Sequence, residues 1–376
     1  MNKRTLCAAA VLAAAFSFAY GQSPVRPKIV SARLAGFAGP FAAQEAGIDT
    51  LSTNPAMLAF SDSVWSLGRL AAHVSGPLFD LPAVFQEDDI SGAILDLVGE
   101  NNGIYIGTEI TGPLSIAHVE RNFGFGIFNR TLIEADIPNL SYGSLIAGEE
   151  VLIAGGYGLT LFRKDFHSLS AGLQLKGFFQ TYATQGGTAL GILDTAESMD
   201  LASIPTLLAT GFGLDAGLLY KLGDGFSAGL VCRDLYTPVF TTEYASLDDY
   251  LAGSAGDTTY ARIEPELTIG ASYNLQLPED WITISQWGFY LDYRDILGLL
   301  DIIPANPVLN VALGTEMILL DVVSLRAGIN QTYAALGLGL DLSIFALDVA
   351  MYGSELGIDP GARPLLNMEV SLAFEY

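Results

Sequence analysis

Apolar and polar side chains alternate with a period of two in many short stretches of the chain. In residues 168–180, Leu, Ala and Phe occupy one set of alternate positions, and Ser, Gln and Lys occupy much of the other. Residues 266–276 repeat the pattern, as do the last ten residues, 367–376. Successive residues of a β-strand point to opposite faces, so each stretch predicts a strand with one apolar face. Such strands build either a soluble β-sandwich or a membrane β-barrel.

Composition separates these two architectures. Of the 376 residues, 51% are hydrophobic and 15% are charged, whereas soluble domains carry roughly 25% charged residues. Beyond the amino terminus, no uncharged apolar run reaches the ~18 residues that a spanning helix needs. A membrane barrel explains both facts, because its strands expose apolar side chains to lipid while their polar faces line the lumen. We therefore predict an all-β fold, an antiparallel transmembrane β-barrel.

Residues 1–22 have the parts of a secretory signal peptide. Lys3 and Arg4 form the basic region, an apolar stretch follows, and residues 19–21 form a small-x-small cleavage site. We therefore expect the mature protein in the bacterial outer membrane. Removal of the signal peptide leaves Cys232 as the only cysteine, so no internal disulfide can form.

The strand count depends on the pair Gly112-Pro113. As a turn, this pair gives an odd number of strands. As a bend within one long strand at 104–120, it gives about fourteen, and bacterial barrels have even numbers. Short turns then fall on one side of the membrane and long connections on the other, with a tight link near Gln331 as the exception. In the first long connection, residues 89–98 predict a short amphipathic helix. The long connections are predicted at 76–102, 134–149, 183–210, 236–263, 295–307 and 353–366.

Charge and motif content exclude several functions. The chain has 41 acidic and 17 basic residues and a formal net charge of −24, which argues against nucleic-acid binding. Residues 225–229 match a Gly-x-Ser-x-Gly nucleophile motif, but they open an alternating strand instead of a strand–turn–helix unit. No His/Cys cluster predicts zinc, and the acidic pairs in loops are interpreted as solvated side chains. We expect no catalysis, no cofactor and no metal.

Two sets of residues are candidates for contact with a ligand. Four of the scarce basic side chains fall on polar phases of strands, where they either line the lumen or form ion pairs between strands. These are Lys176, Arg233, Arg294 and Arg326. The connection after residue 183 and the segment 296–309 are unusually apolar, so they are either lipid-facing strand ends or a hydrophobic pocket at the barrel mouth. The pocket candidates are Ile192, Leu193, Leu201, Ile204, Leu207 and Leu208.

Residues 31–62 lack the strand pattern. They contain a run rich in Gly and Ala, then Asn54, Pro55 and Ala56, then further apolar residues before the first strand. This segment, with the signal peptide and strand layout, resembles the start of the FadL/TodX-type outer-membrane transporters of long-chain fatty acids and other hydrophobic compounds. It is similar in particular to a divergent branch that includes spirochaete barrels. The resemblance implies a fourteen-stranded barrel with an amino-terminal hatch in its lumen, to which Asn54, Pro55 and Ala56 belong.

The resemblance also implies a domain division and a function. Residues 1–22 would be the signal peptide, 23–62 the hatch and 63–376 the barrel. A monomer in outer-membrane lipid would take up fatty acids or other hydrophobic small molecules along a hatch-gated path. The chain departs from the family in one respect, since no basic residue dedicated to a fatty-acid carboxylate is identifiable. Two other functions stay open, a scaffold or shuttle protein of a secretion system and a general, water-filled porin.

Overall fold

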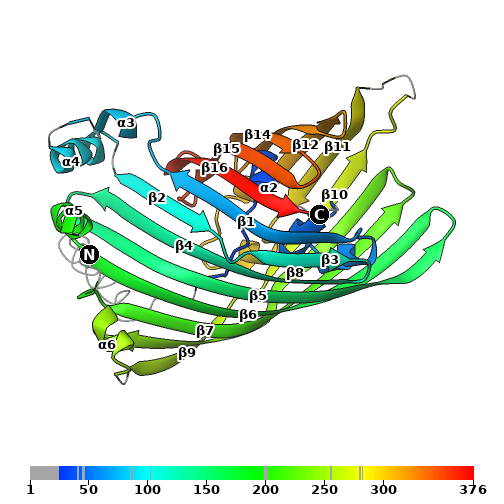
Figure 1. The fold of residues 1–376 in the computed structure, drawn as a ribbon. Coiled ribbons are helices and arrows are strands. Elements are labelled where there is room, and N and C mark those ends of the chain that lie inside the picture. Colours follow the sequence, from blue (N-terminus) through cyan, green and yellow to red (C-terminus); the bar gives the residue numbers. More distant parts are fainter. Residues whose placement is uncertain are drawn as a thin grey trace.

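The computed structural model describes residues 25–376, apart from 40–41, 45–46, 85, 88, 102, 199–201, 255, 279–280 and 282. The predicted signal peptide lies outside these residues. Strand segments form one antiparallel sheet that closes on itself (Figure 1). The segments are β1 (Val64–Ser75), β2 (Ile104–Thr111), β3 (Ile116–Glu120), β4 (Phe123–Asn139), β5 (Tyr142–Lys164), β6 (His167–Gly187), β7 (Thr206–Leu222), β8 (Phe226–Tyr244), β9 (Asp257–Ile263), β10 (Glu266–Asn274), β11 (Ile284–Tyr293), β12 (Val311–Leu319), β13 (Val323–Asn330), β14 (Tyr333–Asp341), β15 (Phe345–Glu355) and β16 (Pro364–Glu375).

Two pairs of segments each form one continuous position in the wall. β2 and β3 lie on either side of the bend at Gly112-Pro113, and both pair with β1 and with β4. β9 and β10 both pair with β8 and are separated by Glu264 and Pro265. Proline cannot donate a ladder hydrogen bond, which explains the break. The wall is therefore a closed antiparallel barrel of 14 strands, as the bend predicted.

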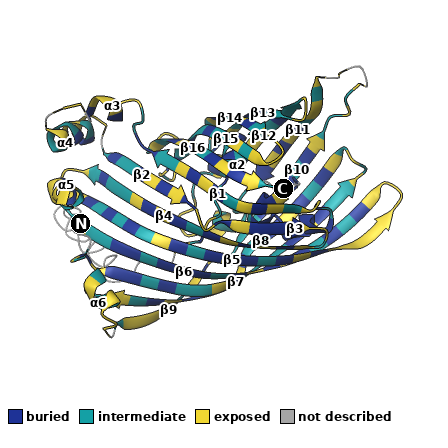
Figure 2. Cartoon of the chain, viewed as in Figure 1, coloured by how far each residue is buried: buried dark blue, intermediate teal, exposed yellow. Residues whose placement is uncertain are grey.

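The first and last strands close the barrel. Trp65 and Tyr376 exchange two backbone hydrogen bonds of 2.9 Å each, and β1 pairs with β16 along its length. On β16, the outward side chain of Phe374 is 44% exposed, whereas the lumenal side chain of Glu369 is 2% exposed. Figure 2 shows the same alternation of buried and exposed residues along the other strands. The period-two pattern of the last ten residues is thus confirmed as a strand with two different faces.

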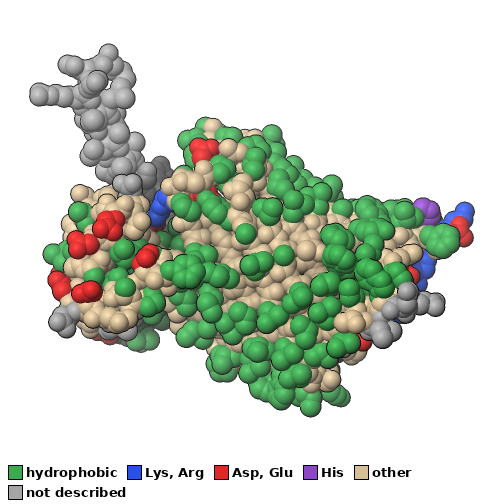
Figure 3. Space-filling view, turned by 90° about the horizontal axis from the view of Figure 1, so that it is seen from above, with side chains coloured by type: hydrophobic (Ala, Val, Ile, Leu, Met, Phe, Trp, Pro, Cys, Tyr) green, Lys and Arg blue, Asp and Glu red, His purple; other side chains and the backbone are tan. Residues whose placement is uncertain are grey.

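The outside of the barrel is apolar around its girth. On β6, Leu173 and Leu175 are 56% and 65% exposed, while Gln174 and Lys176 point inward and are 4% and 8% exposed. Figure 3 shows hydrophobic side chains covering the side of the molecule and acidic side chains gathered at one end. A closed sheet with such a surface satisfies its backbone internally and faces lipid with apolar groups, so it is a transmembrane barrel of the outer-membrane type. Among the described residues, no helix is both long and apolar enough to cross a membrane.

Helical segments occupy the long connections at the end of the barrel opposite the tight turns (Figure 1). The predicted helix at 89–98 is confirmed, because α4 begins at residue 90 and the Asp89 side chain accepts a hydrogen bond from the backbone N–H of Gly92. The helices in these connections are α3 (Leu81–Val84), α4 (Ile90–Glu100), α5 (Ala189–Ser198), α6 (Leu247–Leu251), η3 (Leu297–Leu300) and η4 (Pro307–Asn310).

Three of the predicted connections are wrong in length. The predicted loop at 134–149 is strand, because β4 continues to residue 139 and β5 begins at residue 142. Strands likewise extend into the predicted loops at 183–210 and 236–263. At 134–137, the charged residues Glu134 and Asp136 alternate with the apolar residues Ala135 and Ile137, so the period-two pattern continues into the predicted loop. The pairing between β4 and β5 continues through the same residues.

The described residues of the range 25–62, which we call the plug, lie inside the barrel (Figure 1). The plug contains α2 (Ala32–Gly36), η1 (Gly47–Ser52) and η2 (Pro55–Ala59). α2 packs against β13, β14, β15 and β16, and η2 packs against β4, β5, β6 and β7. Phe37 and Leu58 of the plug are fully buried. Residues 23–24, 40–41 and 45–46 of the predicted hatch lie outside the described residues.

Candidate functional site

The plug touches the wall at glycines. A Cβ atom added to Gly172 would collide with the backbone of Pro55, and one added to Gly217 would collide with the side chain of Asn54. Any larger residue at these two positions would displace η2, so the wall depends on glycine for this close approach. Other wall glycines that meet the plug in the same way are Gly158, Gly229, Gly328 and Gly337.

Asn54 joins three parts of the molecule. Its side chain is fully buried, and its Oδ1 atom accepts a hydrogen bond of 3.0 Å from the backbone N–H of Ala56, which caps η2. Its Nδ2 atom donates to the carbonyl oxygen of Ala42 at 2.8 Å and to that of Leu218 on β7 at 3.1 Å. Pro55 suits the first position of η2 because that position needs no N–H donor. The Asn-Pro-Ala segment therefore both starts η2 and ties it to the wall.

Five consecutive wall positions, β6, β7, β8, β10 and β11, contact the plug, and we call them the balanced arc. Side chains of β6, β10 and β11 bond its backbone, β7 accepts a hydrogen bond from Asn54, and β8 meets Arg26 through Asp234. Besides those of Asn54, further hydrogen bonds join this arc to the plug. The side chains of Ser170, Gln174 and Ser272 donate to the carbonyl oxygens of Ala56 at 3.1 Å, Leu51 at 2.8 Å and Ala43 at 2.9 Å, respectively. Asp292 accepts a hydrogen bond from the backbone N–H of Ala42 at 3.0 Å.

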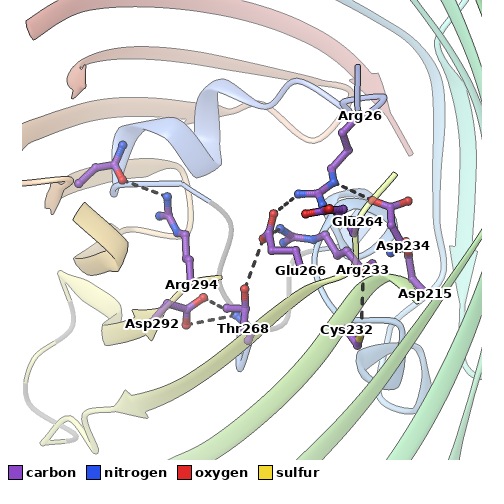
Figure 4. A network of polar contacts seen from close by, with 12 residues as sticks. Arg26, Asp215, Cys232, Arg233, Asp234, Glu264, Glu266, Thr268, Asp292 and Arg294 are labelled. Carbon is purple, nitrogen blue, oxygen red and sulfur yellow. Dashed lines mark hydrogen bonds and ion pairs between the residues drawn. The ribbon is translucent and has the colours of Figure 1, made fainter. Parts of the chain in front are cut away.

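The arc contains cations that are already neutralised. Arg26, from the plug, lies between Asp234, at 2.7 Å, and Glu266. Figure 4 shows how Arg26 enters this network beside Arg233 and Asp215. The plug therefore contributes a charge to the wall as well as backbone groups.

The four predicted basic residues all belong to the lumen-facing polar network, but their surroundings differ. Three of them form ion pairs with lumenal carboxylates: Lys176 with Asp215 and Asp234, Arg233 with Glu266, and Arg326 with Glu316 and Asp348. Arg294 donates instead to the amide oxygen of Asn330 at 3.0 Å and to the carbonyl oxygen of Ala38. It forms no ion pair with a residue that the structure describes.

We call the wall from β16 through β1, β2, β4 and β5 the acidic arc, after the buried Glu109, Glu150 and Glu369 on its lumenal face. Two guanidinium groups, those of Arg69 and Arg130, each form two ion pairs there. Arg69 lies 2.8 Å from Asp49 of the plug and 3.4 Å from Glu375, and Arg130 lies 2.9 Å from Glu109 and 3.3 Å from Glu150.

A further ion pair connects α2 to the rest of the wall. The guanidinium of Arg33 makes a two-point contact with Glu316 of β12, at 3.1 and 3.3 Å. Burial disfavours the charged guanidinium, but the carboxylate of Glu316 outweighs this effect, so the pKa of Arg33 lies above its ordinary value. Arg33 is thus a permanent positive charge of the plug.

A cavity of about 500 Å³ lies between the plug and both arcs. From the acidic arc it is lined by His73, Glu109 and Glu369, and from the balanced arc by residues that include Gln174 and Arg294. The plug contributes apolar residues such as Leu34 and Leu51. The cavity therefore combines apolar surface with charges of both signs, which suits an amphiphilic molecule.

The five described residues of the predicted pocket lie in more than one packed region. Ile192 and Leu193 of α5 are buried in a packed cluster with α3, α4 and the ends of β2, β4 and β5. Leu207 packs in another cluster with Leu132 and Tyr182. Ile204 is buried and Leu208 half-buried, while Leu201 lies outside the described residues. Of those described, none lines the lumenal cavity.

Sequence reasoning missed the residues that shape the cavity. Glu369 is visibly on the polar face of the last strand, and Gln174 is on that of β6. Their approach to one cavity depends on the path of the plug, which carries no periodicity. The ion pair of Asp49 was not predicted either, because its partner Arg69 lies on a strand with weak alternation.

Comparisons with known proteins found matches among solved structures. No protein-family model and no curated protein sequence matches the chain. Among solved structures, a mutant of the TodX monoaromatic hydrocarbon channel matches with 12% identity and a TM-score of 0.47, covering 92% of this chain and 98% of that one. The chain is similar to such channels over nearly its whole length.

Two further structures match over similar spans. The toluene transporter TbuX of Ralstonia pickettii has 13% identity and a TM-score of 0.46, covering 90% of this chain and 96% of its own. A FadL homologue from Pseudomonas aeruginosa has 12% identity and a TM-score of 0.44, covering 93% and 98%. The strand pairings described above, rather than these matches, establish the barrel.

Proposed function

We propose that the protein is an outer-membrane channel through which hydrophobic small molecules pass, long-chain fatty acids among them, and that movement of the plug opens the path. The observation that carries the proposal is the partly apolar cavity between plug and wall. The matched structures are a monoaromatic hydrocarbon channel, a toluene transporter and a FadL homologue, which is consistent with a hydrophobic ligand. No catalytic step is part of this function.

Arg294 is the candidate anchor for the carboxylate of a fatty acid. It lines the cavity, and its guanidinium bonds to an amide and a carbonyl oxygen. A carboxylate could therefore gain a charge-assisted hydrogen bond without displacing an existing ion pair. Lys176, Arg233 and Arg326 would each have to give up a carboxylate partner first.

Plug movement requires that the ligand bind the open state more tightly than the closed one. The hydrogen bonds of Asn54 to the carbonyls of Ala42 and Leu218 hold the closed state. A ligand entering the cavity meets Ala38, whose carbonyl bonds Arg294. Competition for Arg294 is a direct way for a carboxylate to loosen the plug.

Uptake of radiolabelled oleate tests the proposal. Asn54→Ala removes two donated hydrogen bonds, together worth about 2 kcal/mol, and should raise the uptake rate by up to about thirtyfold by increasing the open population. Ser61→Ala is the matched control, because Ser61 bonds only the carbonyl of Met57 within the plug. The control should transport oleate like the wild type.

Unchanged uptake in Asn54→Ala and in a chain lacking residues 31–60 would contradict gating by the plug. Uptake by the wild type no faster than by cells without the protein would contradict transport itself. The porin alternative predicts a steady ion conductance in a planar bilayer, whereas the proposed channel should conduct few ions while its plug is seated. A scaffold would co-purify with partner proteins and retain no lipid.

A further inference from the structure

Three titratable side chains form a row across the acidic arc. His73 on β1 lies directly opposite Glu369 on β16 and directly opposite Glu109 on β2. The Nδ1 atom of His73 lies 3.7 Å from a carboxylate oxygen of Glu109. All three side chains line the lumenal cavity. The register of three neighbouring strands therefore places an imidazole between two carboxylates that face one space.

The two carboxylates of this row are not equivalent. Glu109 is paired with Arg130 at 2.9 Å. Glu369 is 2% exposed, yet its Oε1 atom has no hydrogen-bond partner among the described residues. A buried carboxyl oxygen without a donor is costly, so a partner from outside the chain would stabilise it.

Two further features of the cavity point to the same kind of partner. Gln174, across the cavity, is 4% exposed, and its Oε1 atom is another buried acceptor without a donor. The ring of Tyr352 also lines the cavity and lies parallel to the His73 ring, with 6.1 Å between centroids and 13° between planes. Two unmet acceptors and an aromatic ring favour a ligand that is positively charged or rich in donors.

Both arginines of the arc are already shared between two carboxylates each. The lysines and arginines that line the cavity, Lys28 among them, come from the plug and from the balanced arc. An organic cation on an apolar chain suits this arrangement, because its charge would face the row while its chain contacts the apolar plug residues of the cavity.

We infer that the acidic arc forms a subsite for an amine or quaternary ammonium group of an amphiphilic ligand, with Glu369 as its counter-ion. The inference rests on the proposed function, because it assumes that amphiphiles enter the cavity. Arg294 and Glu369 then define the two polar ends of the cavity. An amphiphile with a cationic group is held at Glu369, and one with a carboxylate is held at Arg294.

Binding to the full mature protein in lipid nanodiscs tests the inference. The probes are dodecyltrimethylammonium, dodecanoate and dodecanol, which share one chain and differ in head group, with empty nanodiscs as the background. We expect Glu369→Gln to weaken binding of dodecyltrimethylammonium about tenfold, which corresponds to about 1.4 kcal/mol. Binding of dodecanoate and dodecanol should change less than about twofold, since neither carries a positive charge.

Glu375→Gln is the matched control. Glu375 is on the same strand and the same face, but it bonds Arg69 and does not line the cavity. It should leave the affinity for dodecyltrimethylammonium within about threefold of wild type, as expected for a charge outside the subsite. An equal loss in both variants would mean that the cation responds to the general charge of the lumen, and would overturn the inference.

A second measurement needs no variant. The uncharged tert-butyl analogue of dodecyltrimethylammonium has the same shape, so the wild-type protein should bind it at least about tenfold more weakly if the ammonium charge is recognised. Equal affinities would overturn the subsite even if Glu369→Gln failed to fold. Binding of dodecanoate and dodecanol without preference for the cation defeats this inference alone. Absence of binding by all four compounds defeats the proposed function as well.

Discussion

The two arcs of the lumen hold the same plug in different ways. On the balanced arc, neutral side chains bond plug carbonyls, glycines let η2 approach the wall closely, and Arg26 of the plug pairs with Asp234 and Glu266. On the acidic arc, the hold includes the ion pair between Arg69 and Asp49. A buried ion pair that loses one partner leaves an uncompensated charge. Arg26 is 33% exposed, whereas Arg69 and Asp49 are 9% and 3% exposed, so the plug is most sensitive to loss of the Arg69–Asp49 pair.

The two arcs also differ in which of their buried polar groups lack a partner. On the balanced arc, Lys176 and Arg233 are neutralised by carboxylates, and the buried acceptors without a donor include the neutral amide oxygens of Gln174 and Gln180. On the acidic arc, two arginines serve four carboxylates, and the acceptor without a donor at Glu369 belongs to a carboxyl group. A buried carboxyl oxygen without a donor is the feature that a cationic ligand would satisfy.

Removal of one cation from each arc is the strongest test of this contrast. Arg69→Gln leaves Asp49 buried without its ion pair and should lower the free energy of unfolding by about 3–5 kcal/mol. Arg233→Gln should lower it by about 1–3 kcal/mol, because its partner Glu266 keeps Arg26. Urea unfolding in lipid vesicles measures both. An equal or larger loss in Arg233→Gln would refute the contrast.

Replacement of a wall glycine by alanine tests how closely η2 packs against the balanced arc. In Gly217→Ala, the new methyl group would collide with the side chain of Asn54, so we expect a loss of about 1–3 kcal/mol through overpacking. Gly177→Ala is the control, because a Cβ there meets nothing within 4 Å, and its effect should stay within about 0.5 kcal/mol. The same unfolding measurement applies. A tolerated Gly217→Ala would mean that η2 is not seated tightly.

The smallest effect is expected at the rim of the acidic arc. Arg363 and Asp136 form an ion pair in which both side chains are 36% exposed. Arg363→Ala should therefore change the free energy of unfolding by less than about 1 kcal/mol, since solvent and salt screen the pair. Because Arg363→Ala and Arg69→Gln each remove an arginine from an ion pair, comparing their losses of stability isolates the effect of burial. A loss of several kcal/mol at Arg363 would show that the rim belongs to the same network as the lumen.

Alternation was sufficient to predict the barrel and the inward direction of Lys176, because the period-two phase decides which face a residue occupies. The bend at Gly112-Pro113 was sufficient for the strand count. Alternation could not supply ion-pair partners, since these depend on register. Between β7 and β8, for example, the register shifts near Leu214, close to the two aspartates that Lys176 contacts. The plug has no repeating pattern at all, so its contacts with the wall, and hence the cavity, needed the structure.

The closure of β1 on β16 has a consequence for biogenesis. Arg69 is bound to Asp49, 20 positions away, and to Glu375, 306 positions away. The anchor of the plug is thus finished only when the end of the chain arrives, long after the plug itself has been synthesised. An insertion machinery that delivers such a chain has to keep the lumen open for its contents and join the seam last. A chain that ended before β16 would present a free edge to its neighbours.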